Sequence, residues 1–302
     1  GGGGPGRGVS LGAAALGRVG NAAIVAPRLV SKLAVAEWQD GGISAGGLGS
    51  LAVAGDFGAD VALTGAGVPL GKPVLGSASI VGRVTAGAWG VAGNAGKLAI
   101  GSAAGAWAVQ VSGDVASLSS VANLSGAWSS RSVRSVSAGG NVEDFAMTLT
   151  QAPDPKLLAL GSLTTRGWLD RCRIVSAGHI GKVAAVSVRD SSVFAGVTAM
   201  RDVNGDGVLD LPDPAADISA SGARIASFVV SGSTGAVPPP DSFINSTVAA
   251  GLLTSVTLPG VQNAAGWPFG LAGHQILSLS YEGVATKLPA PFQDGDFELR
   301  VG

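Results

Sequence analysis

The sequence predicts an all-β protein, a right-handed parallel β-helix that forms a solenoid of about 20-residue coils with loop insertions. Two observations favour this fold. Short segments that share a pattern return about every 20 residues along most of the chain. Within these segments apolar and polar residues alternate, as in "KLAIG" and "KVAAVSV", which is the periodicity of a β-strand.

The clearest marker of the repeat is a small residue, any residue and then Leu or Val. Leu98 and Leu118 occupy this position 20 residues apart, and so do Leu163 and Val183. The marker occurs at residues 31–33, 49–51, 82–84, 96–98, 116–118, 161–163 and 181–183. Because successive coils of a β-helix stack about 4.8 Å apart, residues one repeat apart are expected to form buried ladders. A β-sandwich, the main alternative, gives no reason for this spacing.

A second marker is Trp after Gly or Gly-Ala, at Trp89, Trp107, Trp128 and Trp168, with intervals of 18, 21 and 40 residues. If the rings of Trp89, Trp107 and Trp128 point outward, they form an aromatic ladder able to hold sugar rings. If they point inward, they fill the interior of the coil. We favour the structural interpretation.

The composition excludes several classes of protein. Net charge is −1 and no basic run exists, so the electrostatic signature of a nucleic-acid binder is missing. No run of 18 strongly apolar, uncharged residues predicts a membrane span. Cys172 is the single cysteine, so no internal disulfide can form. Gly, at 49 of 302 residues, is about twice as frequent as usual and suits many tight turns.

The segments "GSLAVAGDFGADVALTG", "GRVTAGAWGVAGNAGKLAIG" and "AWAVQVSGDVASLSSV" resemble the β-strand-repeat modules of very large exported bacterial proteins. The likeness extends over roughly residues 15–302, up to the closing "GDFELRVG". Modules of this type are right-handed β-helices of adhesins and autotransporter passengers. The resemblance implies that fold and export from the cell, and it carries over no catalytic residue.

One stretch, "RDVNGDGVLDLPD" at residues 201–213, has the pattern of a calcium loop. With Asp202 counted as position 1 of the loop, Gly207 at position 6 permits the sharp turn, and Leu209 at position 8 is the usual apolar anchor. Oxygen donors at alternate positions suit Ca²⁺, and neither His nor Cys is near enough in sequence to suggest zinc. The predicted ligands are Asp202, Asn204, Asp206, the carbonyl of Val208, Asp210 and Asp213.

The alternative for this stretch is a solvated turn rich in Asp, Asn and Gly that binds no metal. Pro212 and Pro214 are expected to obstruct a helix that leaves the loop, so an EF-hand switch is not expected. We expect instead a staple, in which Ca²⁺ orders a long insertion that has no core of its own.

Catalytic activity would have to depend on other residues. Arg166, Asp170, Arg171 and Arg173 could line a groove of the kind used by polysaccharide lyases and hydrolases, although exposed strand side chains are the favoured interpretation. Cys172 reads as a buried, inert thiol. His179 reads as a turn residue, and His274 is the only other histidine.

We therefore expect a flexible leader at residues 1–14, β-helix coils at 15–196, a calcium-binding loop insertion at 197–220, and further coils to the C-terminal end at 221–302. The expected function is a non-enzymatic structural or adhesive segment of a larger secreted or cell-surface bacterial protein. Its partners would be polysaccharide or cell-surface components, or other segments of the same long chain, with no nucleic acid and no membrane span. The alternative is a carbohydrate-binding or polysaccharide-degrading β-helix protein.

Overall fold

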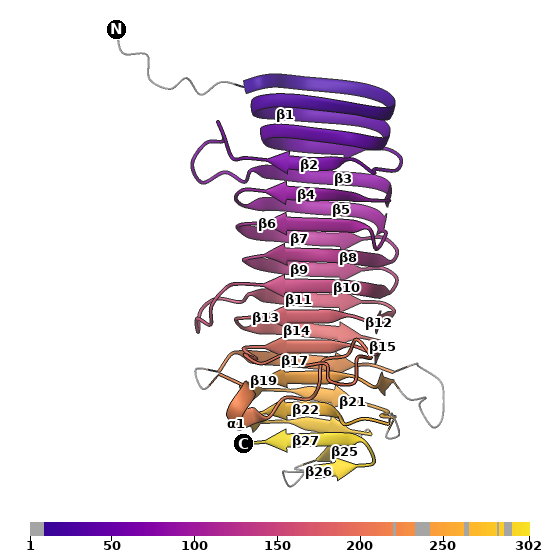
Figure 1. Cartoon of the computed structure of the whole chain (residues 1–302), viewed down its shortest axis with the longest axis vertical. Helices are drawn as coiled ribbons and strands as arrows, with labels where there is room; N and C mark the ends of the chain where they lie inside the picture. The colour runs from indigo at the N-terminus through magenta and orange to yellow at the C-terminus, as the bar shows by residue number, and fades with distance from the viewer. Residues whose placement is uncertain (1–8, 220–221, 233–241, 263–265, 283, 287–291) are drawn as a thin grey trace. The chain divides into compact units, whose positions relative to one another are not determined.

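Both compact units of the chain are built from stacked, parallel β-strands, which confirms the predicted all-β parallel β-helix (Figure 1). The computed structural model describes residues 9–219, 222–232, 242–262, 266–282, 284–286 and 292–302. The N-terminal unit is Gly1–Arg131 and the C-terminal unit is Ser132–Gly302. The described part of the chain contains no helix with the length and apolar character needed to cross a membrane.

In the N-terminal unit the first strand, β1, winds through successive turns of the coil before the shorter strands begin (Figure 1). The strands are β1 (Val9–Val53), β2 (Asp60–Leu63), β3 (Leu75–Val84), β4 (Gly87–Val91), β5 (Ala95–Ala103), β6 (Trp107–Val111), β7 (Asp114–Ser120) and β8 (Leu124–Ser130). Of the expected leader, residues 1–8 lie outside the described residues and residues 9–14 belong to β1.

The C-terminal unit continues with shorter strands and one helical turn. Its elements are β9 (Ser132–Ala138), β10 (Val142–Leu149), β11 (Leu160–Thr165), β12 (Trp168–Asp170), β13 (Arg173–Ser176), β14 (Ile180–Ala185), β15 (Ser187–Arg189), β16 (Ser192–Ala195), α1 (Pro214–Asp217), β17 (Arg224–Val230), β18 (Phe243–Ile244), β19 (Thr247–Ala250), β20 (Leu252–Leu253), β21 (Val256–Leu258), β22 (Phe269–Gly273), β23 (Gln275–Ile276), β24 (Leu279–Tyr281), β25 (Val284–Thr286), β26 (Phe292–Asp294) and β27 (Phe297–Val301). The last two hairpins, β24–β25 and β26–β27, are antiparallel.

The predicted ladders are present in both units. Leu98 of β5 lies in register with Leu118 of β7, and Leu163 of β11 lies in register with Val183 of β14. All four side chains are at most 1% exposed. Along β6 the burial alternates strictly, because successive side chains of a strand point to opposite faces. The tripeptide marker therefore identifies the residues that fill the interior of the coil.

The spacing between register partners changes wherever a loop leaves the coil. Leu75 pairs with Ala95, 20 positions further on, but Ile180 pairs with Ile225, 45 positions further on. The strands on either side of the longer interval still pair in parallel register. Insertions therefore lengthen the loops and leave the coil itself unchanged.

The tryptophans of the N-terminal unit point inward and form a buried aromatic column, as the structural interpretation predicts. Neighbouring rings meet edge to face: Trp89 and Trp107 have centroids 5.5 Å apart, and Trp107 and Trp128 have centroids 6.1 Å apart. Trp107 pairs with Gly87, and Trp89 pairs with Val109. The interval of 18 residues thus places Trp107 diagonally across from Trp89 and in register with Gly87.

The C-terminal unit has a column of left-handed residues at one corner of the coil. Asp144, Arg171, Asp190 and Asn245 have φ values of 48°, 50°, 47° and 38°. Arg171 binds Asp144 at 2.7 Å, and the amide of Asn245 donates to Asp190 at 2.9 Å. The hydrogen bond from Arg171 lowers the pKa of Asp144, against a smaller opposing effect of burial. These bonds stabilise the corner, where the left-handed conformation of one residue in each coil costs backbone strain.

The buried residues that follow this corner are small and polar. Ser191 accepts the backbone N–H of Cys172 at 2.9 Å, and Ser246 accepts that of Ser191 at 3.1 Å. Each side chain therefore satisfies a backbone donor that the turn removes from the regular ladder. Burial raises the pKa of the Cys172 thiol to about 12, which supports the expectation of an inert thiol.

Replacing Leu118 by Ala tests the ladder. Because Leu118 is completely buried, the Leu118→Ala change is expected to lower the free energy of unfolding by about 2–5 kcal/mol, as measured by chemical denaturation. Leu70→Ala is the matched control, since Leu70 is fully exposed, and its effect is expected to stay within about 0.5 kcal/mol. Equal effects of the two changes would contradict the assignment of Leu118 to the core.

Candidate functional site

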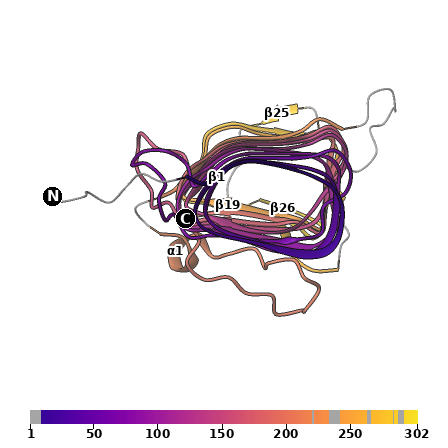
Figure 2. The same ribbon diagram turned by 90° about the horizontal axis from the view of Figure 1, so that it is seen from above.

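The candidate site lies in the insertion between β16 and β17 of the C-terminal unit, which includes the predicted calcium loop. Viewed from above in Figure 2, α1 and the adjoining loop lie outside the strands of the coil. The two ends of the insertion are held together. Val197 and Ile218 form an antiparallel bridge, and both the backbone N–H and the hydroxyl of Thr198 donate to the carbonyl of Asp217, at 2.8 and 2.9 Å.

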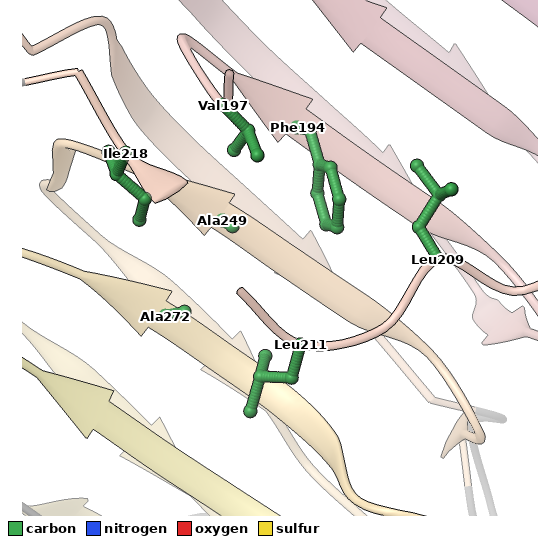
Figure 3. Close-up of a cluster of buried hydrophobic side chains, with 7 residues drawn as sticks. All are labelled: Phe194, Val197, Leu209, Leu211, Ile218, Ala249 and Ala272. Atoms are coloured by element: carbon green, nitrogen blue, oxygen red, sulfur yellow. The ribbon is translucent and has the colours of Figure 1, made fainter. Parts of the chain in front are cut away.

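A hydrophobic cluster holds the insertion against the outer face of the coil (Figure 3). Phe194, Ala249 and Ala272 supply the face of β16, β19 and β22, and every residue of these three strands is buried. The insertion supplies Val197, Leu209, Leu211 and Ile218, each at most 8% exposed. The insertion therefore shares a core with the coil instead of forming one of its own. Apolar burial orders the second half of the insertion.

Leu209 anchors the loop, as its position in the pattern predicts. Its side chain is 2% exposed. Its backbone N–H donates to the hydroxyl of Ser192 at 2.8 Å, and its carbonyl accepts from the hydroxyl of Thr247 at 2.8 Å. Two adjacent coils thus hold the same residue by its backbone and by its side chain.

The tip of the loop is wrapped around its own carboxylates. The two side-chain oxygens of Asp202 accept from the backbone N–H groups of Gly205 and Gly207 at 2.8 and 3.1 Å. Both glycines have positive φ, 72° and 86°, which the tight turn requires. Asp206 accepts from the N–H of Val208 at 2.8 Å. Gly207, at position 6 of the pattern, therefore makes the sharp turn that the calcium-loop interpretation assigns to it.

Four of the predicted ligands, Asp202, Asn204, Asp206 and Asp210, are hydrogen-bonded within this tip. The amide of Asn204 donates to Asp206 at 3.0 Å, and Asp210 accepts from the backbone N–H of Val203 at 3.1 Å. Within the described ranges, no three His, Cys, Asp or Glu side chains are gathered closely enough to hold a metal ion by themselves. The predicted shell also includes the amide oxygen of Asn204 and a backbone carbonyl. A donor set made only of oxygens fits a hard cation such as Ca²⁺.

The last predicted ligand, Asp213, has a second role. It is the N-cap of α1, and its carboxylate accepts from the N–H of Ala215 at 2.9 Å. Pro214 begins the helix, where its missing N–H costs nothing, so the expectation that this proline obstructs a helix is wrong for this single turn. Among the described residues α1 is the only helix, and the pair of helices of an EF-hand is not formed around the loop.

Of the other candidate acids and bases, Asp170 and Arg171 are bound to each other. The carboxylate of Asp170 is buried and forms ion pairs with Arg171 at 2.6 Å and with Arg189 at 2.8 Å. Arg166 and Arg173 are exposed. The side chain of Trp168 is 43% exposed and lies 4.9 Å from the guanidinium of Arg189. Asp170, Arg171 and Arg189 form a surface network of ion pairs.

A pocket of about 310 Å³ adjoins the loop tip. Asn204, Asp206 and Asp210 line it from the insertion. Asn245 lines it from the end of β18, and Trp267 lines it from the segment before β22. The amide of Asn245 lies 3.4 Å from a carboxylate oxygen of Asp206 and so joins the corner column to the loop. The loop tip and the coil therefore enclose one common cavity.

Comparisons of this chain with known protein families, with curated proteins and with solved structures gave no match.

The sequence interpretation missed the coil side of this pocket. Asn245 and Arg300 lie far from the loop in sequence, and only the register of the coils brings them to it. Trp267 was missed as well, because it follows a glycine as Trp168 does, and the sequence does not separate the exposed tryptophans from the buried ones.

The hydrophobic cluster can be tested with Leu209→Ala. Removing this buried side chain is expected to raise amide hydrogen exchange across residues 197–219, because the insertion loses its main anchor, while exchange in β5 and β7 stays unchanged. Val203→Ala, in the same loop but 76% exposed, is the control and is expected to leave the exchange unchanged. Retained protection in Leu209→Ala would show that the cluster does not order the insertion.

His179 predicts a dependence of stability on pH. Its Nδ1 accepts the backbone N–H of Arg224 at 3.0 Å, and burial, together with the charge of Arg224, lowers its pKa. The unfolded chain then binds more protons than the folded one as pH falls through the ordinary histidine pKa of about 6.5. Stability is therefore expected to fall between about pH 7.5 and pH 5, above the range where most carboxylates titrate.

Thermal unfolding across this pH range, compared between the native chain and His179→Asn, measures the effect. The variant is expected to show a smaller loss of stability as pH falls. The same slope in both chains would assign the pH dependence to other groups.

Proposed function

We propose that this chain is a non-enzymatic structural or adhesive segment of a larger secreted or cell-surface bacterial protein, and that its insertion binds Ca²⁺. The observation that carries the proposal is the way the insertion is built. Its second half packs on the coil through apolar side chains, whereas its tip carries Asp202, Asn204, Asp206 and Asp210, whose side-chain oxygens accept hydrogen bonds from the backbone of the same loop.

Electrostatics support a cation at the tip. Four of the predicted ligands are carboxylates within twelve residues, and their mutual repulsion opposes the folded turn. In the proposed site Asp202, Asn204, Asp206, Asp210, Asp213 and the carbonyl of Val208 hold Ca²⁺. Bound Ca²⁺ would supply charge neutralisation and a cross-link between the tip and α1. A loop of this kind can be filled at the millimolar calcium levels found outside cells, which agrees with export.

Two further observations support a non-enzymatic role. Asp170 and Arg171, two of the candidate groups, are bound in ion pairs, and the Cys172 thiol is buried with a raised pKa. The interior of each coil is filled by packed side chains. A solenoid of this type suits an extended scaffold that presents surfaces at regular spacing. The link to adhesins and autotransporter passengers rests on the resemblance of the sequence alone.

Carbohydrate binding is the second candidate function, and a specific observation favours it. The pocket beside the loop joins an exposed tryptophan, Trp267, to amide and carboxylate groups. Such a combination suits the binding of a sugar, and it is compatible with an adhesive role.

Removal of calcium tests the proposal. Adding a chelator is expected to raise hydrogen exchange at residues 202–208, because the carboxylates then repel one another, while residues 209–218 keep the protection given by the cluster. Calorimetric titration is expected to show binding of Ca²⁺ to the native chain and a loss of affinity of about tenfold or more in Asp202→Asn.

Asp154→Asn is the control, since Asp154 lies in another loop, where it accepts the N–H of Lys156 at 2.8 Å. Its calcium affinity is expected to equal that of the native chain. Unchanged exchange with and without chelator, together with no heat of binding at millimolar Ca²⁺, would overturn the calcium assignment.

A further inference from the structure

The pocket beside the calcium loop has the size and the walls of a ligand site. Its volume of about 310 Å³ is at the small end of the range of ligand pockets, about 300–1,000 Å³. It lies within the C-terminal unit, between the insertion and the coil. A cavity of this size fits a small molecule or a short segment of a polymer better than it fits the surface of a folded protein.

Trp267 supplies an apolar platform at this pocket. Its side chain is 55% exposed, whereas Trp38, Trp89 and Trp107 are at most 2% exposed. Phe269, two residues further on, is 1% exposed and packs against Phe297 with ring centroids 5.8 Å apart. The chain beside Trp267 is therefore fixed in the core. A large exposed ring on a rigid support is the arrangement that stacks against the apolar face of a sugar.

The polar groups around this ring are held in place before any ligand arrives. The amide of Asn245 donates to Asp190 at 2.9 Å, and its backbone belongs to the left-handed corner column. The side chain of Arg201 is 62% exposed, and one of the five N–H donors of its guanidinium binds Asp217 at 3.0 Å. Amide, carboxylate and guanidinium groups together can both donate to and accept from hydroxyl groups.

The charges lining the pocket favour a neutral ligand. Its two cations are already paired, Arg201 with Asp217 at 3.0 Å and Arg300 with Glu298 at 2.7 Å. Asp206 and Asp210 add negative charge from the loop. If Ca²⁺ binds, it offsets only part of the charge of the four loop carboxylates. An acidic saccharide would therefore meet a site without surplus positive charge.

We propose that this pocket binds a short segment of a neutral polysaccharide, with a sugar ring stacked on Trp267 and its hydroxyl groups bonded to Asn245, Asp206 and Arg201. The proposal deepens the adhesive role proposed above, on which it rests, by naming the class of ligand. The calcium loop forms one wall of the pocket, so the order of the loop tip also sets the shape of the site.

Binding can be measured by calorimetry and tryptophan fluorescence on the full chain in millimolar Ca²⁺. The probes are four neutral hexasaccharides, from cellulose, xylan, mannan and starch, and one acidic hexasaccharide from polygalacturonate. At least one neutral probe is expected to bind with a dissociation constant in the micromolar to millimolar range. Trp267→Ala is expected to weaken this binding by about tenfold or more, because the stacking platform is lost.

Trp168→Ala is the matched control, since it removes another exposed tryptophan of the same unit, 43% exposed, outside the pocket. It is expected to leave the affinity unchanged. Binding of none of the neutral probes, binding of the acidic probe alone, or equal loss of binding in both variants would overturn the proposal.

Calcium binding, measured in the same samples, separates the two proposals. Trp267→Ala is expected to keep the calcium affinity of the native chain, since Trp267 is not among the proposed metal ligands. A chain that binds Ca²⁺ but no neutral saccharide would contradict the ligand assignment and leave the calcium site standing.

Discussion

Parallel hydrogen bonding between successive coils is the constraint on which the rest of the structure depends. In each unit a strand must lie about 4.8 Å from the next and in register with it, so that each backbone donor finds an acceptor. Side chains at equivalent positions then stack directly on one another, as Leu98 and Leu118 do. The buried tryptophans stack in the same way, since Trp107 meets Trp89 edge to face with ring centroids 5.5 Å apart.

The same constraint determines where function can arise. An insertion that leaves a strand end and returns at the next coil does not disturb the ladder, as the interval from Ile180 to Ile225 shows. Such a loop must still be ordered by something outside the coil. The chain meets this need with an apolar patch on an outer strand face, where Phe194 and Ala249 contact Leu209 and Ile218. The patch fixes the base of the loop and places its acidic tip beside Asn245 and Trp267.

The sequence predicted the features that depend on period. The marker positions, from Leu33 to Val183, are all buried, because this position of the coil points inward. Gly207 of the predicted calcium loop and the anchor of the loop, Leu209, were predicted because their roles are local.

Features that join residues at unequal intervals could not be predicted in this way. The corner column links Asp144 to Arg171 over 27 residues and Asp190 to Asn245 over 55, so no repeat reveals it. The cluster around Leu209 and Leu211 was missed because these residues follow no strand period and find partners only in the folded unit. The helix-capping role of Asp213 was hidden because a ligand and an N-cap require the same side chain.

The most direct test of the stacked-coil account is a set of methyl nuclear Overhauser contacts in the chain labelled at Leu and Val. The account predicts strong cross-peaks between Leu98 and Leu118 and between Leu163 and Val183, which occupy the same interior position of adjacent coils. If these cross-peaks are missing while each methyl group shows contacts to other core residues, the coils are not stacked in this register and the account is wrong.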